Sequence, residues 1–128
     1  MEKTIADYQT IQHNFNQRVS QQYQLPLETP SEGESVLVSS GPIKISMDLQ
    51  HGEVVSITIN CYEDNNPAWD EVFEGFEQGM NWSSISFFNA YRKAVNERQT
   101  VSATAHGIQA VHTSRPNDLT VVLTRVGK

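Results

Sequence analysis

Two neighbouring stretches in the first half of the chain alternate between apolar and polar residues, and this alternation limits the fold more than any other feature. The first stretch is Ile43 to Leu49, and the same pattern returns in residues 55–61 after a turn at residues 50–53. A period of two is typical of β-strands that have one buried face and one wet face. With a shorter strand at residues 36–40, before the turn at Gly41-Pro42, the pattern predicts an antiparallel meander.

The C-terminal part of the chain predicts three further strands, at residues 100–105, 108–113 and 119–126, joined near Gly107 and at residues 115–118. Period-two alternation places the following residues in the core of the sheet: Ile43, Ile45, Met47, Val55, Ile57, Ile59, Leu119, Val121 and Leu123.

The N-terminal segment predicts a helix. Thr4 and Asp7 are spaced as in a capping box, and apolar residues then recur at steps of three or four to about Tyr23. This apolar stripe consists of Ile5, Tyr8, Ile11, Phe15 and Val19. Residues 25–35, with two prolines and a glycine, predict an exposed connection.

The stretch "NNPAWDEVFEGFEQGMNW", from Asn65 to Trp82, predicts the second helix of the chain. Asn66 is a good N-cap residue, Pro67 a good first helical residue, and Gly79 a natural end. A third helix is expected after Ser83 or Ser84. Its expected inner face consists of Phe87, Phe88, Tyr91, Ala94 and Val95.

The predicted order is therefore helix, meander, a bent unit of two helices, and a second set of antiparallel strands. Helices that are segregated on one face of an antiparallel sheet define the α+β class. A length of 128 residues suits a single domain that spans residues 1–128. We find no internal sequence repeat to support a duplication.

Charge is unevenly distributed along the chain. The net charge is −6, but residues 45–91 contain eight acids and no Lys or Arg, and so carry −8, whereas residues 92–128 contain six bases and two acids. Such a field repels nucleic acids and anionic membranes from the acidic side and attracts basic partners. The N-terminus lacks the apolar core of a signal peptide, no apolar run approaches the ~20 residues that span a bilayer, and Cys61 has no second cysteine to pair with. We therefore expect a cytoplasmic protein.

Residues with catalytic or metal-binding chemistry do not form a familiar motif. Cys61 with His51, His106 or His112 as base would make a nucleophile, but the alternation points Cys61 into the core. The four histidines lack close spacing at helical intervals, so we expect surface turn histidines and neither a metal nor another cofactor. An EF-hand register begun at Asp64 places Trp69 where glycine is required.

The acidic residues of the predicted helical unit are poorly placed for stability. Glu74 and Glu77 approach the helix C-terminus, where the dipole opposes negative charge. Glu74 is also repelled, at steps of three or four residues, by Asp70, Glu71 and Glu77. The sequence therefore predicts that Glu74→Gln with Glu77→Lys leaves the fold intact and slightly stabilises it. Seven of the eleven aromatic residues lie in this same unit, where they either fill the core above the sheet or leave an exposed hot spot surrounded by acids.

We therefore expect a non-enzymatic protein-binding module, of the inhibitor, immunity or chaperone-like kind, that engages a basic protein partner. The expected partner-binding residues are Asp70, Glu71, Glu74, Glu77 and Trp82. Self-association into a homodimer is left open. The alternative is a small enzyme or ligand carrier with a pocket between sheet and helices, in which Glu63, Asp64 or Asp70 supplies acid–base chemistry.

Overall fold

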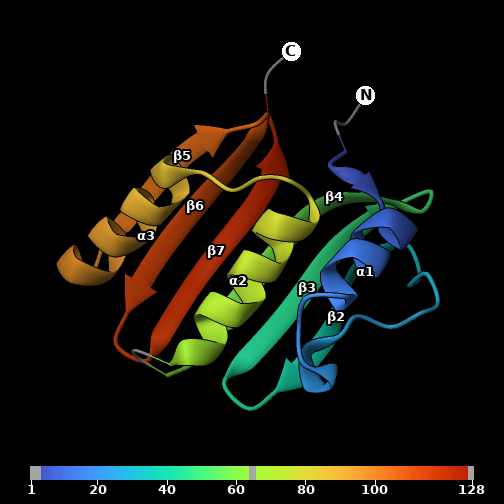
Figure 1. Cartoon of the computed structure of the whole chain (residues 1–128), viewed down its shortest axis with the longest axis horizontal. Helices are drawn as coiled ribbons and strands as arrows, with labels where there is room; N and C mark the ends of the chain where they lie inside the picture. Colours follow the sequence, from blue (N-terminus) through green and yellow to red (C-terminus); the bar gives the residue numbers. More distant parts are fainter. Residues whose placement is uncertain (1–3, 64–65, 127–128) are drawn as a thin grey trace.

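The alternating stretches form one antiparallel sheet in the computed structural model, which describes residues 4–63 and 66–126 (Figure 1). The strands are β1 (Ala6–Asp7), β2 (Gly33–Ser40), β3 (Ile43–Gln50), β4 (Glu53–Cys61), β5 (Thr100–Ala105), β6 (Ile108–Arg115) and β7 (Asp118–Arg125). The helices are α1 (Tyr8–Asn16), α2 (Pro67–Gly79) and α3 (Ile85–Glu97), with a 3-10 turn η1 (Gln21–Tyr23). The predicted element order and the α+β class are confirmed.

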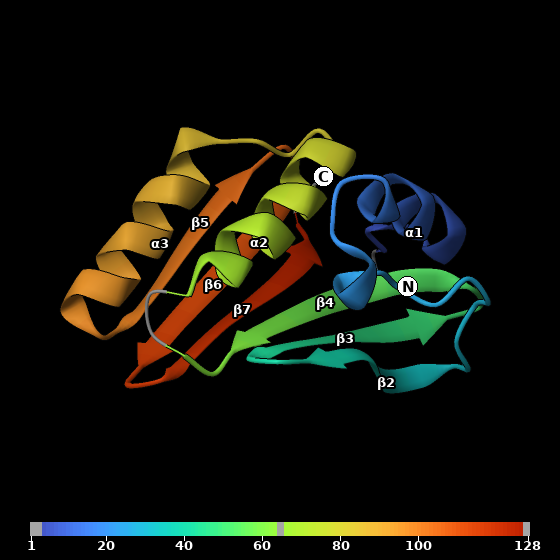
Figure 2. The ribbon, with the colours of Figure 1, turned by 60° about the horizontal axis from the view of Figure 1, so that its bottom comes forward.

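Two meanders meet in the middle of the sheet. The strand order is β2-β3-β4-β7-β6-β5 (Figure 2). The short β1 pairs with β4. β4 and β7 run antiparallel, with Ile57 opposite Leu123 and Ile59 opposite Val121. Each meander therefore contributes its last strand to the centre of the sheet and its first strand to an edge.

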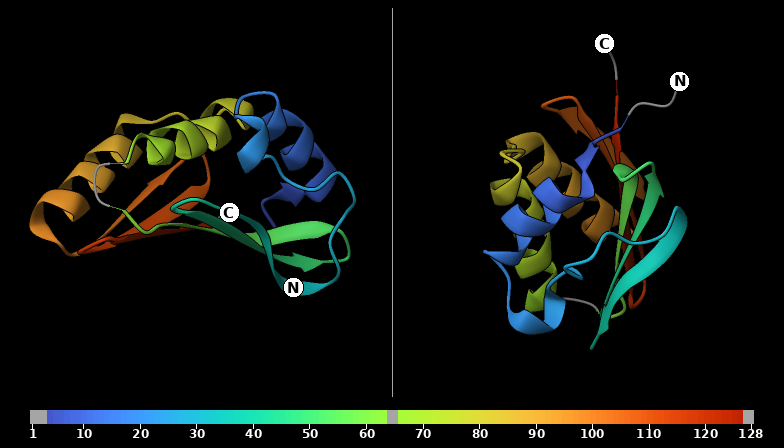
Figure 3. Two further views of the ribbon diagram at one scale, coloured as in Figure 1. Left: turned by 90° about the horizontal axis from the view of Figure 1, so that it is seen from below. Right: turned by 90° about the vertical axis from the view of Figure 1, so that its right-hand side faces the viewer.

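All three helices lie on one face of the sheet, as predicted (Figure 3, left). α1 packs beside α2, and α3 lies over β5 and β6. The opposite side of the sheet carries polar side chains such as Thr58 and Thr120, which alternate with the core residues along β4 and β7. In the part of the chain that the structure describes, no helix is long and apolar enough to cross a membrane.

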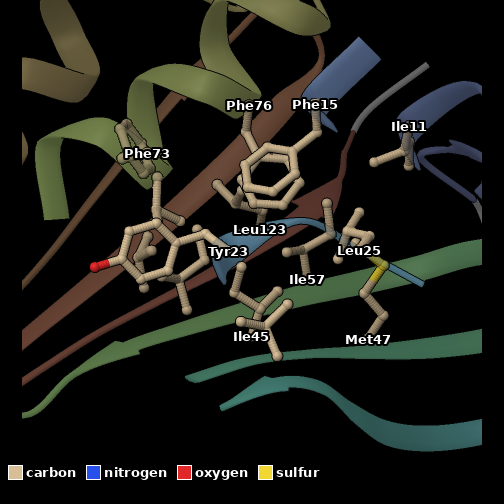
Figure 4. Packing of buried hydrophobic residues seen from close by; sticks show 14 of the residues in the cluster. Ile11, Phe15, Tyr23, Leu25, Ile45, Met47, Ile57, Phe73, Phe76 and Leu123 are labelled. Carbon is tan, nitrogen blue, oxygen red and sulfur yellow. The ribbon is translucent and has the colours of Figure 1, made fainter. Parts of the chain in front are cut away.

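The core lies between the sheet and the helices. The rings of Phe15 from α1 and Phe76 from α2 stack with centroids 4.1 Å apart above Ile57 and Leu123 of the sheet (Figure 4). Of the predicted core positions, those that are buried are Ile43, Ile45, Met47, Ile57, Ile59, Leu119, Val121 and Leu123.

Val55 is the exception, because a β-bulge shifts the register of β4. Ser56 pairs with Asp48 and Val54 pairs with Leu49, so Val55 is the extra residue between them. Val54 is fully buried in the core, and Val55 is half-buried. The prediction that Val55 belongs to the core was wrong, since strict alternation cannot anticipate an inserted residue.

The first helix is shorter than predicted, because the chain enters it from the sheet. The backbone N–H of Ile5 donates to the carbonyl of Val54 at 2.7 Å, so this segment extends the sheet before the helix begins. Asp7 rather than Thr4 caps α1, accepting from the backbone N–H of Thr10 at 3.1 Å. Bonds from Thr10 to its carboxylate also lower the pKa of Asp7. α1 ends at Asn16, well before Tyr23, but the predicted apolar stripe is buried throughout.

A glycine on α2 fixes the distance between α2 and α1. A Cβ atom added to Gly75 would lie 2.7 Å from Cγ1 of Val19 and 3.0 Å from Cε1 of Phe15. The two helices therefore approach more closely than any larger residue at this position allows. This contact sets the place of α2, and the opposite side of α2 faces α3.

Candidate functional site

The α2–α3 unit forms at the boundaries that the sequence predicts. The side chain of Asn66 accepts from the backbone N–H of Ala68 at 2.8 Å and caps α2, which ends at Gly79. The side chain of Ser84 accepts from the backbone N–H of Ser86 at 3.0 Å and caps α3. A groove lies between the two helices.

This α2–α3 groove contains a cavity of about 50 Å³ with a distinctive lining of five aromatic rings and three carboxylates. The lining residues are Trp69, Asp70, Phe73, Glu74, Glu77, Phe87, Phe88 and Tyr91. No Lys or Arg is among them. Within residues 4–63 and 66–126, none of the three carboxylates forms a salt bridge. The groove therefore joins apolar surface to unbalanced negative charge.

Glu77 is the least solvated of the three carboxylates. Burial raises its pKa to about 7, with a further increase from the nearby charge of Glu74, against a backbone hydrogen bond from Ser84 that lowers it. Asp70 and Glu74 are exposed at the mouth of the groove. Removing part of the hydration of Glu77 without adding a cation leaves its charge poorly compensated.

The structure brings together three of the five predicted partner-binding residues and separates the other two. Asp70, Glu74 and Glu77 line the α2–α3 groove. Glu71 instead contacts the segment between α1 and η1, where its carboxylate accepts from the backbone N–H of Ser20 at 2.5 Å. Trp82 is only 5% exposed and belongs to the core, so it offers little surface to a partner.

The α3 side of the groove exposes more apolar surface than predicted. Phe88 was expected on the inner face of the helix but is 51% exposed, and Ile85, one turn earlier, is 71% exposed. The guanidinium of Arg92 lies over the Phe88 ring, 5.7 Å from its centroid. An open hollow of about 310 Å³ continues past this ring between Asp70 and Asn96. Phe88 thus forms part of the solvent-accessible wall of the α2–α3 groove.

His112 is the residue of interest that the sequence interpretation missed. It is fully buried on β6, and both its ring nitrogens lack a hydrogen-bond partner among the described residues. Burial lowers its pKa to about 4, so the imidazole is neutral at pH 7. The expectation of a surface histidine was wrong here. Alternation along β6, with Ile108, Ala110 and Ser114 also buried, is the signal that identifies it.

Two other histidines lie in exposed turns, as the sequence predicts. His51 and His106 occupy turns with positive φ, and the Nε2 atom of His106 lies 3.0 Å from the carbonyl oxygen of Ser83. In the two described segments, no three His, Cys, Asp or Glu side chains gather closely enough to hold a metal ion.

Cys61 and Glu63, at the start of the acidic turn after β4, form local hydrogen bonds. Cys61 is 1% exposed, as its place in the alternation predicted, and its thiol donates to the carbonyl of Glu63 at 3.4 Å. The carboxylate of Glu63 accepts from the side-chain amide of Asn66 at 2.9 Å. Asp64, the other predicted acid of this turn, lies outside the described residues. A cavity of about 20 Å³ beside the turn has room for little more than a water molecule.

In comparisons with protein-family models, curated proteins and solved structures, nothing matches this chain. The function therefore has to be inferred from the chemistry of the groove.

Proposed function

We propose that this protein is a non-enzymatic binding module whose α2–α3 groove engages a basic segment of a partner protein. The observation that carries the proposal is the lining of the groove, where the three carboxylates lie beside the accessible rings of Phe88 and Tyr91 without a neutralising salt bridge in the described chain. Aromatic anchors surrounded by charge are typical of interface hot spots, and complementary charge accelerates encounter.

The raised pKa of Glu77 is consistent with a site that awaits a cation. A positive side chain placed between Glu74 and Glu77 would stabilise both charges and bring the pKa of Glu77 down again. Asp70 at the N-terminal end of α2 is favoured by the helix dipole, but Glu77 at the other end is opposed by it. The charge of Glu77 thus lowers the stability of the free protein, and a basic partner bound beside it would offset this loss.

The size of the cavity favours a binding surface over an enzyme or ligand carrier. Pockets for small molecules usually enclose about 300–1,000 Å³. The α2–α3 cavity of about 50 Å³ is much smaller, and the larger hollow beside it is open. A surface of this shape fits side chains that project from another protein. We propose a cytoplasmic protein partner, rather than nucleic acid or membrane, because the groove would repel phosphate groups.

Capture of partners from the native cell extract tests the proposal. The wild-type bait is compared with the groove variant Asp70→Asn/Glu74→Gln and with the matched control Glu28→Gln/Glu34→Gln. The control changes the net charge equally, but it alters an exposed acid of the loop before β2 and an exposed acid of β2. A stoichiometric basic protein that is retained by the wild type and the control, but lost from the groove variant, supports the function. Equal retention by both variants contradicts it.

A further inference from the structure

Trp69 of α2 and Tyr91 of α3 form a pair of nearly parallel rings at one end of the groove. Their centroids lie 5.8 Å apart and their planes differ by 12°. The His112 ring lies 6.4 Å from Trp69 and 6.3 Å from Tyr91, inclined by 63° and 62°. Because His112 comes from β6, beneath both helices, it lies on the sheet side of the pair and almost equidistant from the two rings.

The imidazole of His112 is a fully buried polar group whose two nitrogens have no partner among the described residues. Buried polar side chains in folded proteins are nearly always hydrogen-bonded, so an exception needs a cause. Its other ring neighbour is Phe73, at 5.6 Å, which offers no hydrogen-bonding atom. An opening between Trp69 and Tyr91 would lead toward this imidazole, which lies within 6.4 Å of both ring centroids.

The surroundings select the chemistry of that ligand. Parallel aromatic faces favour a flat group, neutral His112 offers one acceptor nitrogen, and Asp70, Glu74 and Glu77 favour positive charge. A guanidinium is flat, cationic and rich in N–H donors. Arg92 of this chain already lies over Phe88 on the same wall, so the surface accommodates a guanidinium on an aromatic face.

We infer that Trp69, Tyr91 and His112 form a slot for an arginine side chain of the partner, with the guanidinium between the two rings and an N–H donated to His112. This inference rests on the proposed function and adds to it the identity of one anchoring residue.

The slot opens by displacement of Tyr91. Trp69 is only 3% exposed and fixed in the core, whereas Tyr91 is half-buried. Tyr91 borders the two small cavities of about 20 Å³ and 50 Å³ and also the open hollow past Phe88. Displacement of this ring toward the open hollow would separate it from Trp69.

A titration followed by nuclear magnetic resonance tests the slot with defined probes. The probes are Nα-acetyl-arginine-N-methylamide, the lysine analogue as a control of equal charge, and benzamide as a flat neutral control. The arginine probe is expected to shift the imidazole signals of His112 and the indole N–H of Trp69, but not that of the buried Trp82, and to bind about tenfold more tightly than the lysine probe. Equal binding of the two cations without a shift at His112 overturns the slot. Preferential binding of benzamide overturns the choice of guanidinium.

Two substitutions separate recognition from structure. His112→Leu removes the acceptor and is expected to weaken binding of the arginine probe about tenfold, and His112→Gln, which keeps an acceptor, is expected to restore part of the affinity. Unchanged affinity in His112→Leu contradicts the inference. The two proposals fail differently: loss of the slot leaves the salt-sensitive capture of a basic protein intact. If Asp70→Asn/Glu74→Gln captures the partner normally, the proposed function fails even where the arginine probe still shifts His112.

Discussion

The carboxylate of Glu77 in the last turn of α2 accepts a hydrogen bond from the backbone N–H of Ser84, the N-cap residue of α3. One side chain therefore joins the two helices that form the groove. The same carboxylate is half-buried near Glu74, which makes its negative charge unfavourable. Glu77 thus has a structural role as an acceptor and an electrostatic cost as an anion.

This relationship changes what is expected of substitutions at position 77. Glu77→Gln keeps an oxygen acceptor for Ser84 and removes the charge, so it should slightly stabilise the protein at pH 8. Glu77→Lys would leave the Ser84 N–H facing another donor and should destabilise by about 1 kcal/mol relative to Glu77→Gln. The sequence alone predicted that lysine is favourable here. Urea unfolding measures the free energy of unfolding of both variants. A more stable Glu77→Lys than Glu77→Gln would contradict the structural account.

The pH dependence of stability should contain two opposing contributions. The pKa of His112 is lowered from 6.5 to about 4 in the folded state, so the unfolded chain binds more protons in this range and stability from His112 is lost as pH falls from about 6.5 toward 4. The pKa of Glu77 is raised from 4.5 to about 7, so the folded state binds more protons and stability from Glu77 is lost as pH rises from about 4.5 to 7.

Single substitutions should reveal each contribution. His112→Leu should leave a free energy of unfolding that decreases as pH rises from 4.5 to 7, and Glu77→Gln should leave one that increases from pH 4 to 6.5. Urea titrations at half-unit pH intervals measure both slopes relative to the wild type. Parallel profiles for all three proteins would mean that neither group titrates as its surroundings indicate.

Gly75 should resist replacement by alanine, although alanine is the better helix former by about 1 kcal/mol. The added Cβ would lie 2.7 Å from Cγ1 of Val19, so Gly75→Ala should destabilise by about 1–3 kcal/mol. Combining it with Val19→Ala, which removes that atom, should cost less than the sum of the two single changes. If the losses in free energy of unfolding from Gly75→Ala and Val19→Ala were additive in the double variant, the helices would have room to separate.

The bulge in β4 predicts opposite sensitivities for two adjacent valines. Val54→Ala should cost about 2 kcal/mol because Val54 is fully buried, whereas Val55→Ala should cost less than about 1 kcal/mol. Thermal unfolding of the two variants compares them directly. A larger loss of stability in Val55→Ala than in Val54→Ala would contradict the bulge and support regular alternation in β4.

The regular parts of the fold could be predicted because local chemistry determines them. Asn66 and Ser84 cap their helices through their own side chains, and the alternation of β3 and β7 follows directly from the pleat. The departures arise from long-range pairing, which local patterns do not contain. Val54 pairs with Ala6 of the distant β1 next to the bulge at Val55, and this pairing keeps Ala6 and Asp7 in the sheet before α1 begins.

The site was predictable in its charges but not in its geometry. Three carboxylates on one helix were visible in the sequence, but their meeting with Phe88 and Tyr91 depends on how α3 packs over β5 and β6. Glu71 was indistinguishable from Glu74 until the contact with Ser20 placed it on the α1 side. His112 was missed because histidine is common at surfaces, although the alternation of β6 predicts its burial.

The most direct test of the central claim is the association rate of a captured basic partner at low and high salt. For Asp70→Asn/Glu74→Gln, association should be several-fold slower than for the wild type at low salt and should depend less on salt. At about 0.1 M salt, Glu28→Gln/Glu34→Gln, with the same net charge, should associate nearly as fast as the wild type, because long-range attraction is then weak beyond about 10 Å. Equal rates for the two double variants would contradict a partner site in the α2–α3 groove.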